Sequence, residues 1–305
     1  MSLNTIKSLK ILTIVENMVG RKVWGSWGLS MLLEFEDAKN VKRKVLFDTG
    51  GDKKVFLHNI EALEVDITDI NSIVVSHGHW DHTAALVEVV QSSGGIKVFC
   101  HPDTFLPRLV VNKEGKKREI GVPKEQQMDK IEAVGGEIIF NKEPTEICPG
   151  LWTTGEVKRV SFEKPMELAE GTKLIKMKDD IEIEDKILDD QSLWMNVNNF
   201  GSLILTGCAH AGLLNITNQI KELGKFDKLM GLIGGTHLVG RKDDYITETI
   251  NGLKSLDMIL LSPCHCTGFK VTAQLWQYFP KEFYLNYCGR KFEFQMDNLP
   301  EEKIF

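Results

Sequence analysis

The stretch SHGHWDH, residues 76–82, concentrates side chains that can bind metal ions. It holds three of the chain's eight histidines, His77, His79 and His82, together with Asp81. In extended or turning backbone, residues two apart point to the same side, so His77 and His79 can bind one ion. Asp81 and His82 lie around the following turn and can face a second ion. Imidazole and carboxylate suit zinc, iron or manganese and are poor ligands for calcium.

Histidines also follow other apolar runs along the chain, at His101, His210, His237 and His265. In an open α/β sheet, ligands bind at the carboxyl ends of the strands, so these side chains can converge on one cleft. A closed structural zinc site is often built from paired CxxC cysteines, and this sequence has no CxxC. We therefore expect an open, catalytic metal site. His101 is expected to be structural, and His58, which has no histidine companions, is expected to have no role in the site.

The elements that would position these residues follow from the apolar periodicity. In the first half we predict strands at 10–15, 28–35, 42–50, 71–77 and 96–101, with helices at 54–66 and from 84 to the Gly94-Gly95 stop. In the second half, strands at 201–210, 228–238 and 258–268 alternate with helices at 211–224 and 244–256. Such alternation predicts an α/β protein with right-handed crossovers and at least part of a parallel sheet.

Two charged stretches, at about 106–127 and 161–186, fit neither period. We expect solvated loops or hairpins there, or a lid beside the site, since long insertions often acquire that role. No repeat, linker or low-complexity tract interrupts the chain, so the sequence predicts a single domain over residues 1–305.

Composition excludes several classes of function. The chain has 305 residues, 42% hydrophobic and 26% charged, with a formal net charge of −6. A general nucleic-acid binder would carry a basic face, so we expect none bound. No apolar run is long enough to span a membrane. The six scattered cysteines are typical of reduced thiols, and no secretory signal is evident, so a cytoplasmic location is expected.

The sequence SHGHWDH resembles the H-x-H-x-D-H signature of the metallo-β-lactamase superfamily. Asp48 in LFDTG resembles the strand-ending aspartate upstream of that signature. The segments LTGCAHAG, GGTHL and SPCHCTG resemble the branch related to a dihydropteroate-synthase-like enzyme of methanopterin biosynthesis. The resemblance runs from about residue 29 to 268. It implies an α/β (α+β) fold, the αββα sandwich of two mixed sheets flanked by helices, with metals at one edge.

The resemblance also implies roles for individual residues. His77 and His79 would bind the first metal, Asp81 and His82 the second, and His265 would complete the second site. Two divalent ions are implied, with zinc first and iron or manganese as alternatives.

The third histidine that binds the first metal in this family, and the aspartate that bridges the two metals, have no clear counterpart in this sequence. We expect His210 to supply the missing imidazole. Cys208 stands where a bridging aspartate would end a strand, and either metal binding or packing would suit it. Asp190 is a second, weaker candidate for approaching the metals.

Further residues in or near these motifs are expected to have supporting roles. Asp48 is expected to orient a ligand histidine through its other ring nitrogen. His237 could bind substrate or donate a proton, or be structural. Cys264 and Cys266 flank His265 and are expected to point away from it and pack. Trp27 and Trp80 could line a substrate pocket, but a position in the core is the default expectation for each. Lys158 and Arg159 could contact an anionic substrate, but an exposed basic pair is usually only solvated.

The function expected is a metal-dependent hydrolase. Zinc lowers the pKa of its bound water to about 7, which supplies hydroxide at neutral pH. The expected substrate is a small molecule, which could be anionic, with a phosphoester slightly preferred over other esters. Asp81 would orient the nucleophile or receive its proton. The alternatives are a pterin-forming transferase similar to 7,8-dihydropterin-6-methyl-4-(β-D-ribofuranosyl)aminobenzene-5'-phosphate synthase, an iron-dependent oxidoreductase, and a non-catalytic metal-binding protein. The oligomeric state is left open.

Overall fold

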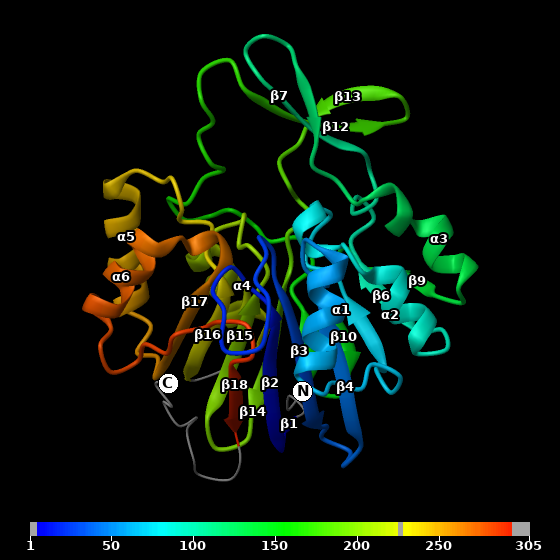
Figure 1. The fold of residues 1–305 in the computed structure, drawn as a ribbon. Helices are drawn as coiled ribbons and strands as arrows, with labels where there is room; N and C mark the ends of the chain where they lie inside the picture. The colour runs from blue at the N-terminus through cyan, green and yellow to red at the C-terminus, as the bar shows by residue number, and fades with distance from the viewer. Residues whose placement is uncertain (1–4, 225–227, 295–305) are drawn as a thin grey trace.

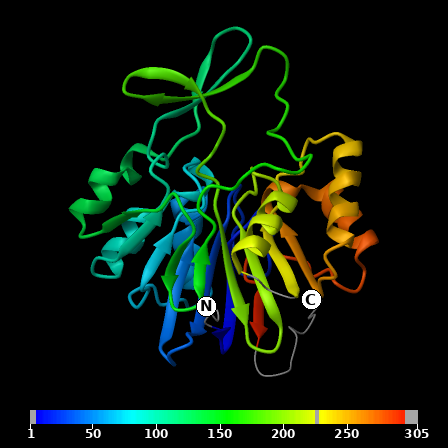
Figure 2. The same cartoon turned by 180° about the vertical axis from the view of Figure 1, so that it is seen from behind.

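The computed structural model describes residues 5–224 and 228–294. Two seven-stranded mixed sheets lie face to face, and helices cover their outer faces (Figure 1). Figure 2, from behind, shows the same layers with the helices on either side. Three separate apolar clusters fill the spaces between the four layers. The predicted αββα sandwich is therefore the observed fold.

The first sheet contains both antiparallel and parallel pairs. Its strand order is β18 (Lys291–Phe294), β2 (Ser8–Val15), β3 (Ser30–Glu36), β4 (Lys42–Phe47), β5 (Ser72–Val74), β6 (Lys97–Cys100) and β9 (Glu137–Phe140). Its outer face is covered by α1 (Lys53–Ala62), α2 (Leu86–Ser92) and α3 (Met128–Ala133). The predicted meander of the first three long strands is confirmed, because β2, β3 and β4 pair antiparallel in sequence order.

The second sheet carries the later motifs. Its strand order is β10 (Thr145–Cys148), β11 (Leu151–Thr153), β14 (Ser192–Val197), β15 (Gly201–Thr206), β16 (Leu229–Gly235) and β17 (Leu260–Cys264), and β1 (Thr5–Ile6) also pairs with β14. Its outer face is covered by α4 (Leu213–Gly224), α5 (Asp243–Lys254) and α6 (Phe269–Tyr278). Strands β15, β16 and β17 run parallel, as the alternation of strands and helices predicts.

Strand β5 illustrates why an unbroken apolar run leads to the site. Val74 packs in the cluster between the two sheets, whereas Ile73 and Val75 pack under the helices of the first sheet. Both faces of the strand are therefore buried, which is why its residues do not alternate with polar ones. The chain emerges from this buried strand directly into Ser76 and His77, so the start of the metal-binding stretch is held by the core.

The two charged insertions pair with each other. They form a separate antiparallel sheet in the order β13 (Ile181–Glu184), β12 (Lys173–Lys178), β7 (Arg108–Val111) and β8 (Lys117–Glu119), which stands above the layers in Figure 1. The prediction of hairpins is confirmed, since β7 pairs with β8 and β12 with β13. Their joining through β7 and β12 was not foreseen.

A buried ion network anchors this insertion sheet. The two terminal nitrogens of the Arg108 guanidinium lie 2.7 Å from Asp185 and 2.7 Å from Asp189, and all three side chains are fully buried. Asp189 also accepts a hydrogen bond of 2.8 Å from the backbone N–H of Gly78. The network therefore connects the insertion sheet to the centre of SHGHWDH. Gly78 is required there, because a Cβ would lie 1.9 Å from the carbonyl oxygen of Thr104.

We expect Arg108→Ala to lower the free energy of unfolding by about 3–5 kcal/mol, because it leaves two buried carboxylates without their cation. Denaturant unfolding measures this loss. Lys117→Ala is the matched control, since Lys117 pairs with Glu182 in the same sheet at a half-exposed position and such pairs contribute about 0–1 kcal/mol. Equal effects of the two substitutions would contradict the anchoring role of Arg108.

Candidate metal centre

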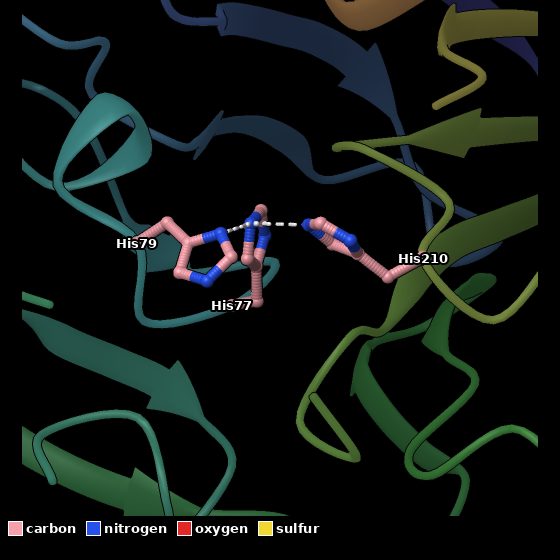
Figure 3. A group of neighbouring side chains, drawn as sticks. All are labelled: His77, His79 and His210. Atoms are coloured by element: carbon pink, nitrogen blue, oxygen red, sulfur yellow. Dashed lines mark hydrogen bonds between the residues drawn. The ribbon is translucent and has the colours of Figure 1, made fainter. Parts of the chain in front are cut away.

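Three histidine nitrogens converge on one point (Figure 3). His77 Nε2 lies 3.0 Å from His79 Nδ1 and 3.2 Å from His210 Nε2. In a tetrahedral zinc site with Zn–N bonds of about 2.0–2.1 Å, neighbouring nitrogens are separated by about 3.3 Å. The three rings come from the loops after β5 and β15, and they fit a first metal position.

Burial keeps these imidazoles in the neutral form that binds metal. It is the largest cause that lowers the pKa of His77 and His210 well below the ordinary value. Burial, followed by the charge of Arg108, also lowers the pKa of His79 to about 4. The three side chains therefore present lone pairs rather than positive charges to one another.

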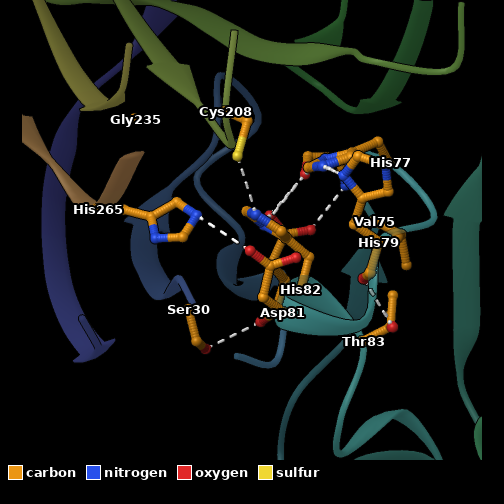
Figure 4. Close-up of polar contacts among 12 residues, drawn as sticks. Ser30, Val75, His77, His79, Asp81, His82, Thr83, Cys208, Gly235 and His265 are labelled. Atoms are coloured by element: carbon orange, nitrogen blue, oxygen red, sulfur yellow. Dashed lines mark hydrogen bonds and ion pairs between the residues drawn. The ribbon is translucent and has the colours of Figure 1, made fainter. Parts of the chain in front are cut away.

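A second group of donors adjoins the first (Figure 4). Ligand atoms of Asp81, His82 and His265 lie within 4.8 Å of one another, and the Asp81 carboxylate is 3.5 Å from His265 Nε2. Burial alone would raise the pKa of Asp81, but the charge of His82 and the contact with His265 hold it well below its usual range. An ionised carboxylate beside two imidazoles fits a second divalent cation.

Cys208 lies between the two groups. Its Sγ is 3.2 Å from His82 Nε2, and it falls within 4.8 Å of ligand atoms of both His77 and His82. The loop 207–210 bends sharply at Ala209, where φ is +59°, so that Cys208 and His210 both reach the centre. The structure thus brings Cys208 to the position between the predicted metal sites.

Asp48 orients two of these histidines at once. Its Oδ2 accepts a hydrogen bond of 2.7 Å from Ser76 Oγ and lies 2.7 Å from His82 Nδ1. Because Ser76 Oγ donates its proton to Asp48, it accepts from His77 Nδ1, 2.9 Å away. Both imidazoles then carry their proton on Nδ1 and offer Nε2 to a metal. This geometry is the one expected of Asp48 as a residue that orients a ligand histidine.

The remaining expected residues are placed beside the donors. Asp190 accepts a hydrogen bond of 3.0 Å from the N–H of Ala211 and another from that of His210, so it holds the backbone of the loop rather than a ring. Burial raises its pKa to about 7. His237 stacks near His210, with ring centroids 4.1 Å apart, and its buried Nδ1 has no hydrogen-bond partner among the described residues. It belongs to none of the donor groups found in the described part of the chain.

Cys266 was assigned to packing, away from His265, and that prediction is wrong. Cys208, His265 and Cys266 have ligand atoms within 4.8 Å of one another. The expectation relied on alternation along a strand, but β17 ends at Cys264 and His265 has a φ of +52°. Beyond the end of the strand, alternation no longer holds. Cys264 does pack between the sheets, as expected.

A cavity of about 300 Å³ opens onto the two donor groups. Trp27 and Trp80 line it, so the default expectation that they belong to the core is wrong. Of the adjacent pair Lys158 and Arg159, only Arg159 lines the cavity. The insertion sheet supplies part of the wall through Val110, Arg118 and Leu174. The prediction of a lid beside the site agrees with this placement.

The histidines assigned no role in the site lie elsewhere. His101 Nε2 is 3.0 Å from Glu156, and His58 stacks on Trp24 with ring centroids 3.8 Å apart. Sequence reasoning missed Asp189, although it adjoins Asp190 in LDDQSL. The sequence does not show which side of the chain each of these two neighbouring aspartates faces, so it could not distinguish their roles.

Comparison with known proteins identifies the family of the chain. The family model of the metallo-beta-lactamase superfamily matches residues 28–158. An uncharacterised protein of Methanocaldococcus jannaschii is 30% identical over 266 residues, covering 87% of this chain and 93% of that protein. The chain belongs to the metallo-β-lactamase superfamily.

A second related protein and a solved structure match almost the whole chain. A protein of Methanocaldococcus jannaschii named 7,8-dihydropterin-6-methyl-4-(beta-D-ribofuranosyl)-aminobenzene-5'-phosphate synthase is 28% identical over 300 residues, 96% of this chain and 99% of that protein. A crystal structure of a metal-dependent hydrolase of the beta-lactamase superfamily is 23% identical, with a TM-score of 0.78 over 94% of this chain and 100% of that one. The latter likeness establishes the shared fold. No helix in the described ranges is long and apolar enough to cross a membrane.

We expect Asp48→Asn to weaken metal binding by about 10–100-fold, the usual cost of losing a carboxylate that orients a ligand histidine. Asn has the same shape and tolerates the φ of +60° at this position, so the fold should be retained. Competition with a chromophoric chelator measures the affinity. Asp52→Asn, which changes the exposed cap of α1, should bind metal like the unmodified protein. An unchanged affinity in Asp48→Asn would contradict the orienting role.

Proposed function

We propose that the protein is a metal-dependent hydrolase that acts on an anionic, phosphate-bearing small molecule. The observation that carries this proposal is the pair of adjoining groups of metal-binding side chains, which line a cavity whose wall also contains arginine and lysine side chains. When bound by these donors, divalent ions supply Lewis-acid chemistry and an activated water. The family membership supports the metal-dependent chemistry, and the cavity supports the class of substrate.

The charged side chains of the cavity wall favour an anion. Away from the donor groups, Arg118, Arg159 and Lys186 line the cavity together with the carboxylate of Asp185. Asp185 is already paired with Arg108. Arg159 is held in place by donating to the carbonyl of Lys186 at 2.7 Å, while its buried Nε has no partner among the described residues. Because Arg159 lines the cavity, N–H groups of its guanidinium that face the cavity can bind a phosphate oxygen.

Other residues would position the substrate and move a proton. The tryptophan side chains of Trp27 and Trp80 offer apolar surface that can exclude water and contact a flat ring. Asp81 is ionised and adjoins the donors, so it can orient the attacking nucleophile or receive its proton. His237, neutral because burial lowers its pKa to about 3, lies at the cavity wall and can donate a hydrogen bond to substrate.

The second candidate is the pterin-forming synthase activity named for the relative of 28% identity. It is favoured by the nearly complete coverage of both chains and by the aromatic wall of the cavity, since the product in that name contains flat rings and a phosphate. The active site would then hold two substrates for condensation rather than one for hydrolysis.

Elemental analysis of the purified protein should show about two divalent ions per chain, and zinc is the ion that we expect. With the metal content established, phosphodiesters and phosphomonoesters are incubated singly in ¹⁸O-labelled water. Hydrolysis transfers labelled oxygen to a product of one substrate. The same compounds are then incubated in pairs, and a joined product that forms only from a pair and carries no label would favour the synthase. Absence of bound metal after reconstitution would refute both.

We expect Asp81→Ala to reduce turnover by about 10²–10⁴-fold, the range for loss of a group that handles a proton. The three-histidine position should keep its metal, so at least one ion per chain is expected to remain. Asp66→Ala serves as control, because it removes an exposed carboxylate that accepts hydrogen bonds from the backbone N–H and the hydroxyl of Thr68. Full activity in Asp81→Ala would contradict the assignment.

We expect Arg159→Ala to raise KM for a phosphate-bearing substrate by about 10–100-fold, which corresponds to a charge-assisted hydrogen bond of about 1.5–3 kcal/mol. Steady-state kinetics over a range of ionic strength measures this effect. The neighbouring variant Lys158→Ala removes an exposed charge outside the cavity and should leave KM unchanged. If both variants behave alike, Arg159 does not bind the anion.

A further inference from the structure

Two cysteine side chains meet beside the second donor group. Cys208 and Cys266 come from loops 58 residues apart in sequence, and the Cys266 thiol lies 3.5 Å from the carbonyl oxygen of Cys208. The sulfurs of both residues and a ring nitrogen of His265 are within 4.8 Å of one another. Both cysteines are buried, yet both line the cavity. They are therefore shielded but face the proposed metal centre.

The backbone is shaped to admit the second sulfur. The left-handed conformation of His265 turns Cys266 toward the loop after β15. Gly235, at the end of β16, lies opposite: a Cβ on it would be 2.8 Å from Cys266 Sγ and 2.2 Å from the carbonyl oxygen of Gly207. Any larger residue at Gly235 would displace the sulfur. The space between these strand ends is thus occupied by Cys266.

One of the two hydrogen bonds of Cys266 suits an anionic sulfur, whereas the other, which the thiol donates to the carbonyl oxygen of Cys208 at 3.5 Å, is given up when the thiol loses its proton. The N–H of His237 donates to its Sγ at 3.2 Å. The other four cysteines are placed differently. Cys264 packs between the sheets, and the partly buried Cys148 packs against the same cluster. Cys100 packs under the helices of the first sheet, and Cys288 is hydrogen-bonded to the backbone of Glu16. Within the described residues, only Cys208 and Cys266 belong to the donor groups.

We propose that Cys208 and Cys266 both bind the second metal ion as thiolates, together with His265. This inference rests on the metal centre of the proposed function and assigns a ligand that the family signature does not include. Each thiol releases its proton to solvent as the metal–sulfur bond forms. Soft sulfur ligands select zinc or ferrous iron, whereas manganese and magnesium prefer oxygen. The site therefore takes zinc or iron in preference to the harder ions.

The test is cobalt(II) substitution, followed by absorption spectroscopy in the near ultraviolet. Cobalt bound by thiolate shows a sulfur-to-metal charge-transfer band, which nitrogen and oxygen ligands do not produce. We expect this band in the unmodified protein, about half its intensity in Cys208→Ser and in Cys266→Ser, and none in the double variant. Cys264→Ser, which alters the buried neighbour on the other side of His265, should retain the full band.

X-ray absorption of the zinc-loaded, unmodified protein provides a measurement that does not depend on the folding of variants. A Zn–S shell at about 2.3 Å, distinct from Zn–N and Zn–O at about 2.0–2.2 Å, is expected. For two ions and two thiolates, the average is about one sulfur per zinc.

The outcomes separate the inference from the function on which it rests. Bound cobalt without a charge-transfer band, or zinc without a sulfur shell, overturns the thiolate site and leaves the hydrolase proposal standing. A band that disappears in Cys208→Ser but is unchanged in Cys266→Ser overturns the role of Cys266. Failure of the protein to bind cobalt or zinc at all overturns the inference together with the proposed function.

Discussion

The carboxylate of Asp48 is the interaction on which the arrangement of the centre depends. Asp48 directly follows β4 and is fully buried. Its carboxylate accepts hydrogen bonds from the Ser76 backbone, from the Ser76 hydroxyl and from the ring of His82. These contacts join two adjacent strands of the first sheet and set the tautomers of two histidines. Gly207 closes over the same group, because a Cβ there would lie 2.2 Å from Ser76 Oγ. The two sheets therefore meet at this carboxylate.

The donors themselves are divided between the sheets. The first sheet supplies a compact run along one loop, in which Asp81 and His82 fall in a single 3-10 turn. The second sheet supplies donors from two separate loops, which follow the parallel strands β15 and β17. His237, after the intervening strand β16, lies beside them. Parallel strands place their carboxyl ends at one edge, so distant residues can face one cavity. The mixed topology thus makes a two-sided centre from a local motif and a dispersed one.

The sheet formed from the two insertions lies beside the centre and forms part of the cavity wall. It is fastened at its base by Arg108, whose two carboxylate partners come from the second insertion and the segment after it. Asp189 is shared between this arginine and the backbone of Gly78. A change in the position of the insertion sheet would therefore move the loop that carries His77 and His79. The same sheet places Arg118 on the cavity wall.

Much of the fold and the local half of the centre could be predicted from the sequence. The apolar runs of the two sheets, the helices between them and the histidine-rich turn depend on contacts with near neighbours or on simple burial, which the periodicity records. His210 and His265 could be expected because each follows a strand. The likeness to a known family added the order of the layers.

The tertiary structure alone decided the features that depend on distant segments. The turn of Cys266 toward Cys208 requires a left-handed His265 and an open space at Gly235, and no local pattern encodes that pair. The pairing of β7 with β12 joins segments far apart in the chain, so neither insertion reveals it by itself. Likewise, Trp27 and Trp80 line the cavity only because the loops around them meet there. The sequence by itself determined which residues could bind metal or transfer a proton. Three-dimensional packing decided which of them face one another, because the direction of a side chain beyond the end of a strand is set by contacts between elements.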